Sequence, residues 1–104
     1  MISIQFLKKK GSFTGFEAKG HALSAPYGSD IVCAAVSSAC IMAANTITEV
    51  IGAGATAKSA EGRMVVLLRG QNSAASDILA GLSLHLTQLS EQYPENVEVT
   101  VTEV

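Results

Sequence analysis

The chain opens with apolar and polar residues in alternation. Ile2, Ile4 and Phe6 are separated by single polar residues, and this period of two predicts a half-buried strand. A lysine-rich turn follows, and residues 13–21 predict a second strand. Because only a short turn separates the two segments, we expect them to pair as a hairpin.

Two later segments have the spacing of helices. Residues 31–51 are apolar on nearly all sides near their start and end at the glycines of 52–54. A helix of this kind is buried on most sides, either centrally or under a partner subunit. A second helix starts at Asn72 or Ser73, which are good N-caps, and ends before Pro94. Its apolar residues, three and four apart, are Ile78, Leu79, Leu82, Leu86 and Leu89.

Three more strands complete the prediction. Residues 55–59 predict a weak strand, 64–68 a strongly apolar one, and 96–103 a final strand with alternating valines. The order of elements is therefore ββαββαβ. This order is typical of an α+β fold, and we expect one small domain over residues 1–104 with two helices packed on a mixed or antiparallel sheet.

Composition and charge exclude several classes of protein. The formal net charge is −2, and the only basic cluster is at 8–10, so the sequence lacks the basic stripe of a direct nucleic-acid binder. The lysines follow the first apolar stretch instead of preceding it, unlike a signal peptide. The apolar run 31–44 falls short of the roughly 20 residues that span a bilayer. We therefore expect a soluble cytoplasmic protein without membrane association.

Cys33 is the first candidate for chemistry. The predicted helix start at 31 places this thiol in the first turn, where unpaired N–H groups and the helix dipole favour the thiolate. His21 precedes it across a short loop and falls on the polar face of the second strand if the alternation continues. A nucleophile and its general base need this pair of groups. The alternative is a small apolar filler and an exposed strand-end histidine.

Three neighbours of Cys33 have weaker signals. Asp30 is expected as a helix cap, and it could also orient the imidazole of His21. Ser37 lies one turn beyond Cys33 and either bonds back to a helix carbonyl or lines the same pocket. Cys40 is two turns inside the helix and is interpreted as packing. The histidines and cysteines have no metal-ligand spacing, and we expect no metal and no cofactor.

A thiol redox enzyme is one competing hypothesis. Cys33 and Cys40 are seven residues apart on one predicted helix, which separates their Cα atoms by roughly 10 Å. A disulfide needs no more than about 7 Å. The two cysteines are therefore not expected to form a bridge, and this spacing argues against a redox pair.

Two motifs carry a family resemblance. Gly20-His21-Ala22, followed after a short loop by the segment from Gly28 to Ser37 (GSDIVCAAVS), resembles the ribosomal-processing cysteine protease family, Prp. The resemblance extends over the length of the chain and its ββαββαβ order. It implies a bacterial cysteine endopeptidase that removes an N-terminal extension from a large-subunit ribosomal protein, in support of ribosome assembly.

The resemblance also implies roles for individual residues. Cys33 would be the nucleophile and His21 the base, Asp30 and Ser37 would support them, and the glycines Gly20 and Gly28 would frame a mobile loop. The partner would be the precursor ribosomal protein, held in a shallow apolar cleft, and the enzyme would be a homodimer. A non-catalytic ribosome-associated adaptor, in which the cysteine is incidental, is the second competing hypothesis.

Overall fold

The computed structural model describes residues 1–20 and 27–104, with 27–30 described as backbone. Within these ranges the order of elements is ββαββαβ, as predicted, with a π-helical extension of the first helix. The elements are β1 (Ile2–Lys9), β2 (Ser12–Lys19), α1 (Tyr27–Asn45), the π-helix η1 (Thr46–Ile51), β3 (Ala55–Ala60), β4 (Arg63–Leu68), α2 (Ser73–Gln92) and β5 (Val97–Glu103).

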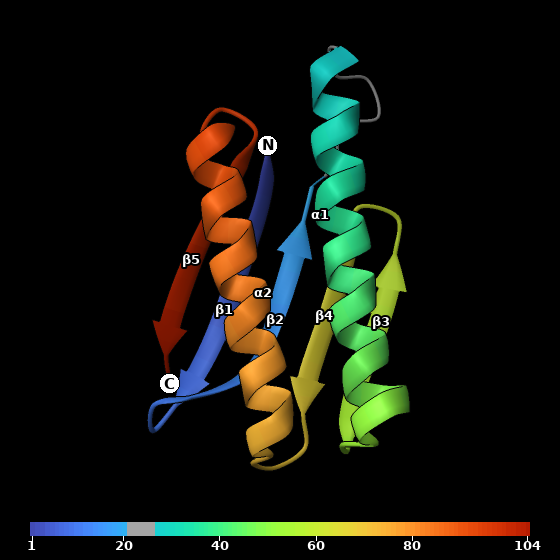
Figure 1. Ribbon diagram of the computed structural model, residues 1–104, viewed down its shortest axis with the longest axis vertical. Helices are drawn as coiled ribbons and strands as arrows, with labels where there is room; N and C mark the ends of the chain where they lie inside the picture. Colours follow the sequence, from blue (N-terminus) through green and yellow to red (C-terminus); the bar gives the residue numbers. More distant parts are fainter. Residues whose placement is uncertain (21–26) are drawn as a thin grey trace.

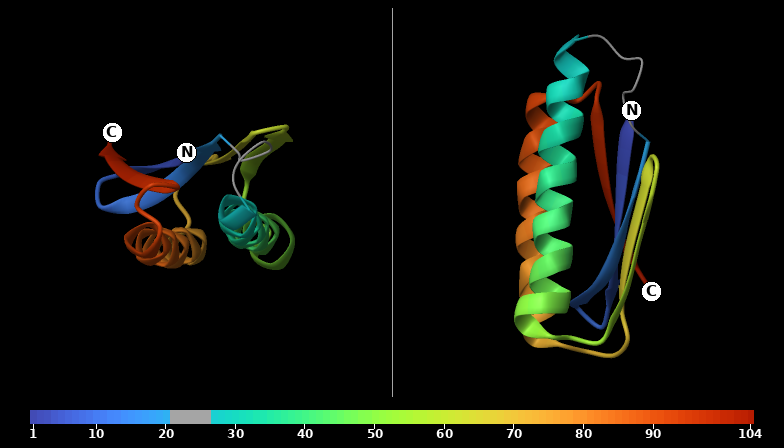
Figure 2. Two further views of the ribbon diagram at one scale, coloured as in Figure 1. Left: turned by 90° about the horizontal axis from the view of Figure 1, so that it is seen from above. Right: turned by 90° about the vertical axis from the view of Figure 1, so that its right-hand side faces the viewer.

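The strands form one sheet in the order β3-β4-β2-β1-β5 (Figure 1). β5 runs parallel to β1, and the other neighbouring pairs are antiparallel. The sheet is therefore mixed, and the predicted α+β fold is confirmed. Both helices lie on the same face of the sheet (Figure 2). α2 lies in front of β1 and β2, and α1 lies in front of β4 and β3 (Figure 1).

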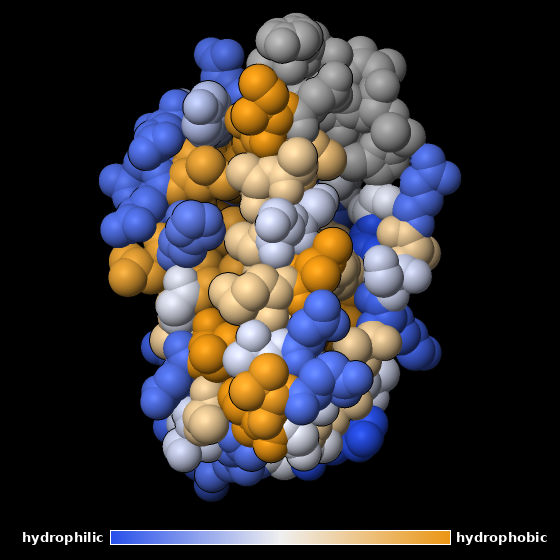
Figure 3. Space-filling view, turned by 45° about the vertical axis from the view of Figure 1, so that its right-hand side comes forward, coloured by the Kyte–Doolittle hydropathy of each residue, from blue (hydrophilic) through white to orange (hydrophobic). Residues whose placement is uncertain are grey.

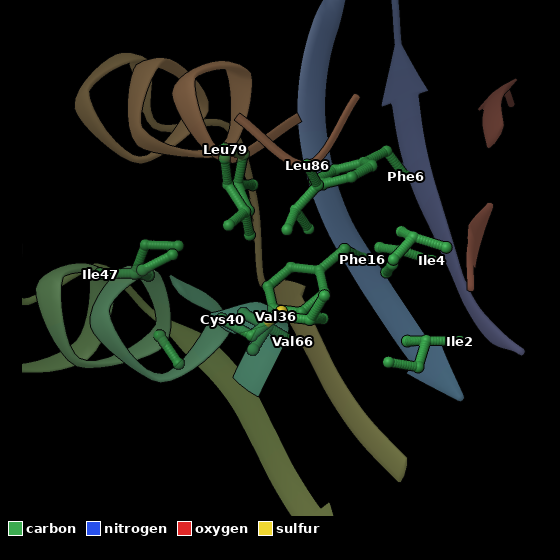
Figure 4. Packing of buried hydrophobic residues seen from close by; sticks show 14 of the residues in the cluster. Ile2, Ile4, Phe6, Phe16, Val36, Cys40, Ile47, Val66, Leu79 and Leu86 are labelled. Carbon is green, nitrogen blue, oxygen red and sulfur yellow. The ribbon is translucent and has the colours of Figure 1, made fainter. Parts of the chain in front are cut away.

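The core follows from the alternation along the strands. Ile2, Ile4 and Phe6 of β1 are buried, whereas Gln5 between them is exposed, because successive strand residues point to opposite faces of the sheet. Phe16 of β2 is also fully buried. These side chains meet the inner faces of both helices (Figure 4), which contribute Val32, Val36, Cys40, Ala43, Leu79, Leu82 and Leu86.

α2 begins as its sequence predicts. Of the two candidate caps, Asn72 is the N-cap, and its side-chain Oδ1 accepts a hydrogen bond of 2.9 Å from the backbone N–H of Ala75. The helix ends at Gln92, and Tyr93 is the C-cap, which agrees with the predicted stop before Pro94. The predicted apolar stripe provides most of its buried residues.

α1 differs from the prediction at both ends. It begins at Tyr27, four residues before the expected start at 31. At the other end the helix widens into the π-helix η1, whose C-cap Gly52 adopts a left-handed φ of 70° and donates its N–H to the carbonyl of Ile47. A glycine adopts this conformation without the steric cost of a Cβ, so the predicted stop at 52–54 is confirmed.

The first helix has more apolar surface than the rest of this chain buries. The helix over residues 31–51 is long and apolar enough to cross a membrane, with a mean hydropathy of 1.7 in its most apolar stretch. The expectation that the run is too short considered only residues 31–44 and does not hold for the whole helix. Only 28% of the most apolar stretch is buried, and the expected burial on most sides is not met within one chain. The inner face of α1 belongs to the core, and a helix crossing a bilayer alone would lose that packing.

Candidate active site

Cys33 faces a hollow between α1 and the turn that joins β3 to β4. Its side chain is half-buried, and it is a free thiol. The hollow is a cavity of about 170 Å³, lined mainly by apolar side chains of α1, β1 and β4. The lining residues are Ile2, Ala18, Gly20, Cys33, Val36, Ser37, Cys40, Ile41, Ser59, Ala60, Gly62, Arg63 and Met64.

Helical spacing brings Cys33 and Ser37 to the same cavity. Residues four apart lie on one face of an α-helix, and Ile41 continues this face by one more turn. The structure thus supports the second interpretation of Ser37, as a polar group in the pocket of Cys33. No side-chain hydrogen bond of Ser37 is present within the described residues, whereas Thr46 and Thr48 do bond back to helix carbonyls.

The far wall of the cavity is built from the hairpin of β3 and β4. Ala60 pairs with Arg63 across a two-residue turn, and Gly62 in that turn has a φ of 74°. The carbonyl of Gly62 accepts a hydrogen bond of 2.9 Å from the N–H of Gly20 at the end of β2. This bond ties the last described residue of the β2 segment to the cavity wall.

Gly20 cannot be replaced by a larger residue in this conformation. Its φ is 91°, and a Cβ built on it would lie 2.3 Å from the carbonyl oxygen of Met1. This position at the cavity edge therefore requires glycine, and the role of Gly20 in framing a loop stays a prediction. His21, the predicted base, follows it in sequence and lies outside the described residues.

The start of α1 corrects the expected setting of Cys33. Because α1 begins at Tyr27, Cys33 is its seventh residue and not a first-turn residue. The effect of the helix dipole falls off within the first turn, and the N–H of an interior helix residue bonds to the carbonyl four positions back. Neither the dipole nor this N–H can therefore activate the thiol in the way expected from the sequence.

The same correction applies to Gly28 and Asp30. Both lie inside the first turn of α1, so Gly28 does not bound a loop and Asp30 is not the helix cap. Glycine inside a helix costs only about 1 kcal/mol relative to alanine, and an acidic residue is favourable throughout the first turn. Gly28 and Asp30, which in the sequence indicate the start of the helix, can therefore both lie within it. The side chain of Asp30 lies outside the described part.

Arg63 is a cavity residue that the sequence did not reveal. Its guanidinium lies against the carboxylate of Glu17 on the neighbouring strand, with an Nε–Oε2 hydrogen bond of 2.7 Å. This hydrogen bond, with a smaller contribution from Lys19 at 3.4 Å, holds the pKa of Glu17 below its usual value. In the sequence, Arg63 belongs only to a predicted hairpin turn, and nothing in that turn indicates that Arg63 lies near Cys33.

Cys40 behaves as predicted. Its side chain is 1% exposed, and burial raises the pKa of its thiol to about 11. Both cysteines are free in this structure. Within the described residues, no cluster of three metal-ligating side chains is present.

Comparison with known proteins gives a consistent result. A family model described as cysteine protease Prp matches residues 1–98. The structure of SMU.848 from Streptococcus mutans is similar, with a TM-score of 0.88 and 28% identity over 100% of this chain and 96% of that one. No curated protein sequence matches the chain.

Structures of a ribosomal processing protease Prp from S. aureus are similar as well. One contains a covalently linked product peptide and has a TM-score of 0.87, with 25% identity over 98% of this chain and all of that one. Another contains a substrate peptide and has a TM-score of 0.89 with the same coverage, and at 24% identity it supports the fold alone.

Proposed function

The chain belongs to the cysteine protease Prp family, and we propose that it is an endopeptidase with Cys33 as nucleophile and His21 as general base. The observation that carries the proposal is the position of Cys33. It is the half-buried cysteine, it lines an open cavity, and the other cysteine is sealed in the core with a raised pKa. A nucleophile must reach its substrate, and Cys33 meets this requirement.

The proposed reaction has two steps. The Cys33 thiol gives its proton to His21, and its sulfur bonds to the scissile carbonyl carbon. The C–N bond then breaks, His21 returns the proton to the leaving amine, and a thioester remains. Water hydrolyses the thioester, which releases the acid product and restores the thiol. Because Cys33 lies beyond the first turn of α1, deprotonation of its thiol depends on His21 in this proposal.

The developing oxyanion needs a hydrogen-bond donor. Cys33's own N–H lies inside the helix and is not available. Within the described part of the cavity, Ser37 and Ser59 carry side-chain donors. Strand alternation directs the Arg63 side chain to the opposite face of the sheet, where it pairs with Glu17. We assign Ser37 this supporting role because it shares the α1 face of Cys33, whereas Ser59 lies on β3 across the cavity. Asp30 is proposed to orient His21.

The proposed substrate is the precursor of a large-subunit ribosomal protein that carries an N-terminal extension. Two observations support it: the likeness to the S. aureus ribosomal processing protease, which is 25% identical, and an apolar cavity of about 170 Å³ beside Cys33, large enough for one apolar side chain. Cleavage would contribute to ribosome assembly in the cytoplasm, where both free cysteines would remain reduced.

Intact-mass measurement of the precursor protein tests the proposal directly. The protein should release one discrete N-terminal peptide. A His21→Gln variant should cleave at least a hundredfold more slowly, whereas the matched variant His85→Gln, on the exposed face of α2, should cleave normally. A precursor that binds but is never cut would instead support the adaptor.

We also propose a homodimer formed through α1. Ile31 and Met42, on its outward face, are 60% and 58% exposed, and apolar side chains run along α1 on the surface in Figure 3. Burying such side chains between two copies would stabilise association. Met42→Glu should shift the chain to monomers in sedimentation, and Gln88→Glu on the exposed face of α2 should not. A wild-type monomer at every concentration would contradict this arrangement.

A further inference from the structure

We propose that the peptide substrate binds as an added strand on the outer edge of β3, with alternate side chains entering the groove between β3 and α1. This inference rests on the proposed protease function and specifies how the substrate is held. Addition of a strand to a sheet edge is a general mode of peptide recognition, in which main-chain hydrogen bonds provide affinity and pockets for alternate side chains provide specificity.

β3 offers a free hydrogen-bonding edge. It is an outermost strand of the sheet, and the bond of 2.8 Å from the N–H of Arg69 to the carbonyl of Gly54 sets the alternation of its pairing with β4. The N–H and C=O groups of Ala57 and Ser59 therefore point away from β4. Within the described residues no backbone hydrogen bond reaches either group, and both residues are exposed.

A groove runs beside this edge and leads to Cys33. The cavity of about 170 Å³ at Cys33 is adjoined by a second cavity of about 250 Å³, and the two share Ile41, Ser59 and Met64. The second cavity extends the groove along α1 as far as Asn45. In Figure 3, α1 and the β3 side of the sheet come forward, with apolar side chains along α1 and polar ones toward the right-hand margin.

The dimensions suit a short extended peptide. From residue 33 to residue 45, α1 rises roughly 18 Å, and a β3 of six residues is roughly 20 Å long. About six extended residues would therefore cover the edge with one end at Cys33. The pairing would place alternate peptide side chains over the groove, and the others over the open face of the sheet near Lys58.

The composition of β3 explains why the groove stays open. Its sequence, ATAKSA, contributes only Ala55, Ala57 and Ser59 on the helix side. Alanine and lysine are depleted in strands, and for this reason the sequence predicts β3 only weakly. Their small side chains do not fill the space that a valine or isoleucine would occupy. The other outer strand, β5, carries valines at these alternate positions and lies at the far end of the sheet.

A backbone-methylation scan of the substrate tests the proposal. The probe is a peptide that copies the N-terminal extension of the precursor, with single N-methyl groups at successive positions, bound to the Cys33→Ala variant. Strand addition predicts that binding weakens tenfold or more at every second position and little at the positions between. A profile without this period of two would overturn the proposal. Wild-type cleavage of the unmodified peptide, measured in parallel, reports on the protease function separately.

An Ala57→Pro variant tests the same edge from the enzyme side. Proline removes the N–H that faces outward, and an edge strand tolerates proline at such a position. KM should rise at least tenfold with kcat nearly unchanged, while Ala57→Ser should behave as wild type. If Ala57→Pro is unfolded by circular dichroism, Ala57→Leu, which narrows the groove, should raise KM instead. An unchanged KM in a folded variant, or loss of dimers with normal cleavage, would overturn the proposal.

Discussion

The two helices cover the same face of the sheet but fill the space beneath them differently. α2 directs leucines at the sheet, and Leu79 and Leu86 are completely buried. α1 directs smaller residues there, Val36, Cys40 and Ala43, and cavities remain between it and the β3–β4 hairpin. The half under α2 is thus a close-packed core, and the half under α1 keeps open space beside the Cys33 thiol.

Polar contacts repeat this contrast. The hydroxyl of Ser76 on α2 accepts a hydrogen bond of 2.9 Å from the N–H of Phe13 on β2. Phe13 also meets Phe6 edge to face, with ring centroids 5.8 Å apart. Among the residues described, no side-chain hydrogen bond joins α1 to the sheet. We infer that α2 determines stability and that α1 carries the chemistry.

Removal of the sulfur of Cys33 should produce the largest effect on activity and almost none on stability. Cys33→Ala should reduce kcat/KM at least a thousandfold, on the order of 4 kcal/mol of transition-state stabilisation. Because the side chain is only half-buried, the urea midpoint should change little. Peptide cleavage and urea unfolding, measured on the same sample, check both parts. Residual cleavage near the wild-type rate would exclude Cys33 as nucleophile.

Truncation on α2 should do the opposite. Leu79→Ala leaves a cavity in a fully buried site and should lower the free energy of unfolding by about 3 kcal/mol. Leu84→Ala on the same helix is the matched control, since Leu84 is 61% exposed, and should change it by less than about 0.5 kcal/mol. Equal losses for the two variants in urea would contradict the assignment of α2 as the stabilising helix.

These two halves also differed in how well the sequence predicted them. The leucine spacing of α2 and its Asn72 cap are local signals, and both are confirmed. The start of α1 was placed too late because Gly28 and Asp30 resemble a boundary although a helix tolerates both. Strand periodicity correctly predicted that β1 is half-buried, with Ile2, Ile4 and Phe6 in the core.

The candidate site was predictable only where its residues share an element. Cys33 and Ser37 are one helical turn apart, so their common cavity follows from spacing. Ser59, Arg63 and Met64 reach this cavity through the pairing of strands, and no local pattern indicates which helix will cover that hairpin. The role of His21 remains a prediction from the sequence and the family resemblance.

Alkaline pH should reveal the contribution of the buried Cys40 thiol to the stability of the fold. Burial raises the pKa of its thiol from 9.0 to about 11, so above pH 9 the unfolded chain ionises this group while the folded chain does not. Stability is therefore lost as the pH rises from 9 to 11, by about 2–3 kcal/mol. Urea unfolding of wild type and Cys40→Ala across this range should show the steeper decline in wild type. Parallel curves would show that Cys40 is accessible to water.

Loss of the α2 cap should produce the smallest effect. Asn72→Ala removes the acceptor for the N–H of Ala75 and should lower the free energy of unfolding by about 1 kcal/mol. Asn72→Asp keeps an acceptor beside the positive end of the helix and should restore the stability. Because no residue of α2 is among the described residues that line the cavity of Cys33, neither variant should change kcat/KM at a temperature where both are folded. A change in cleavage with an unchanged urea midpoint would mean that α2 also contributes to the chemistry, and the separation of the two helices by role would fail.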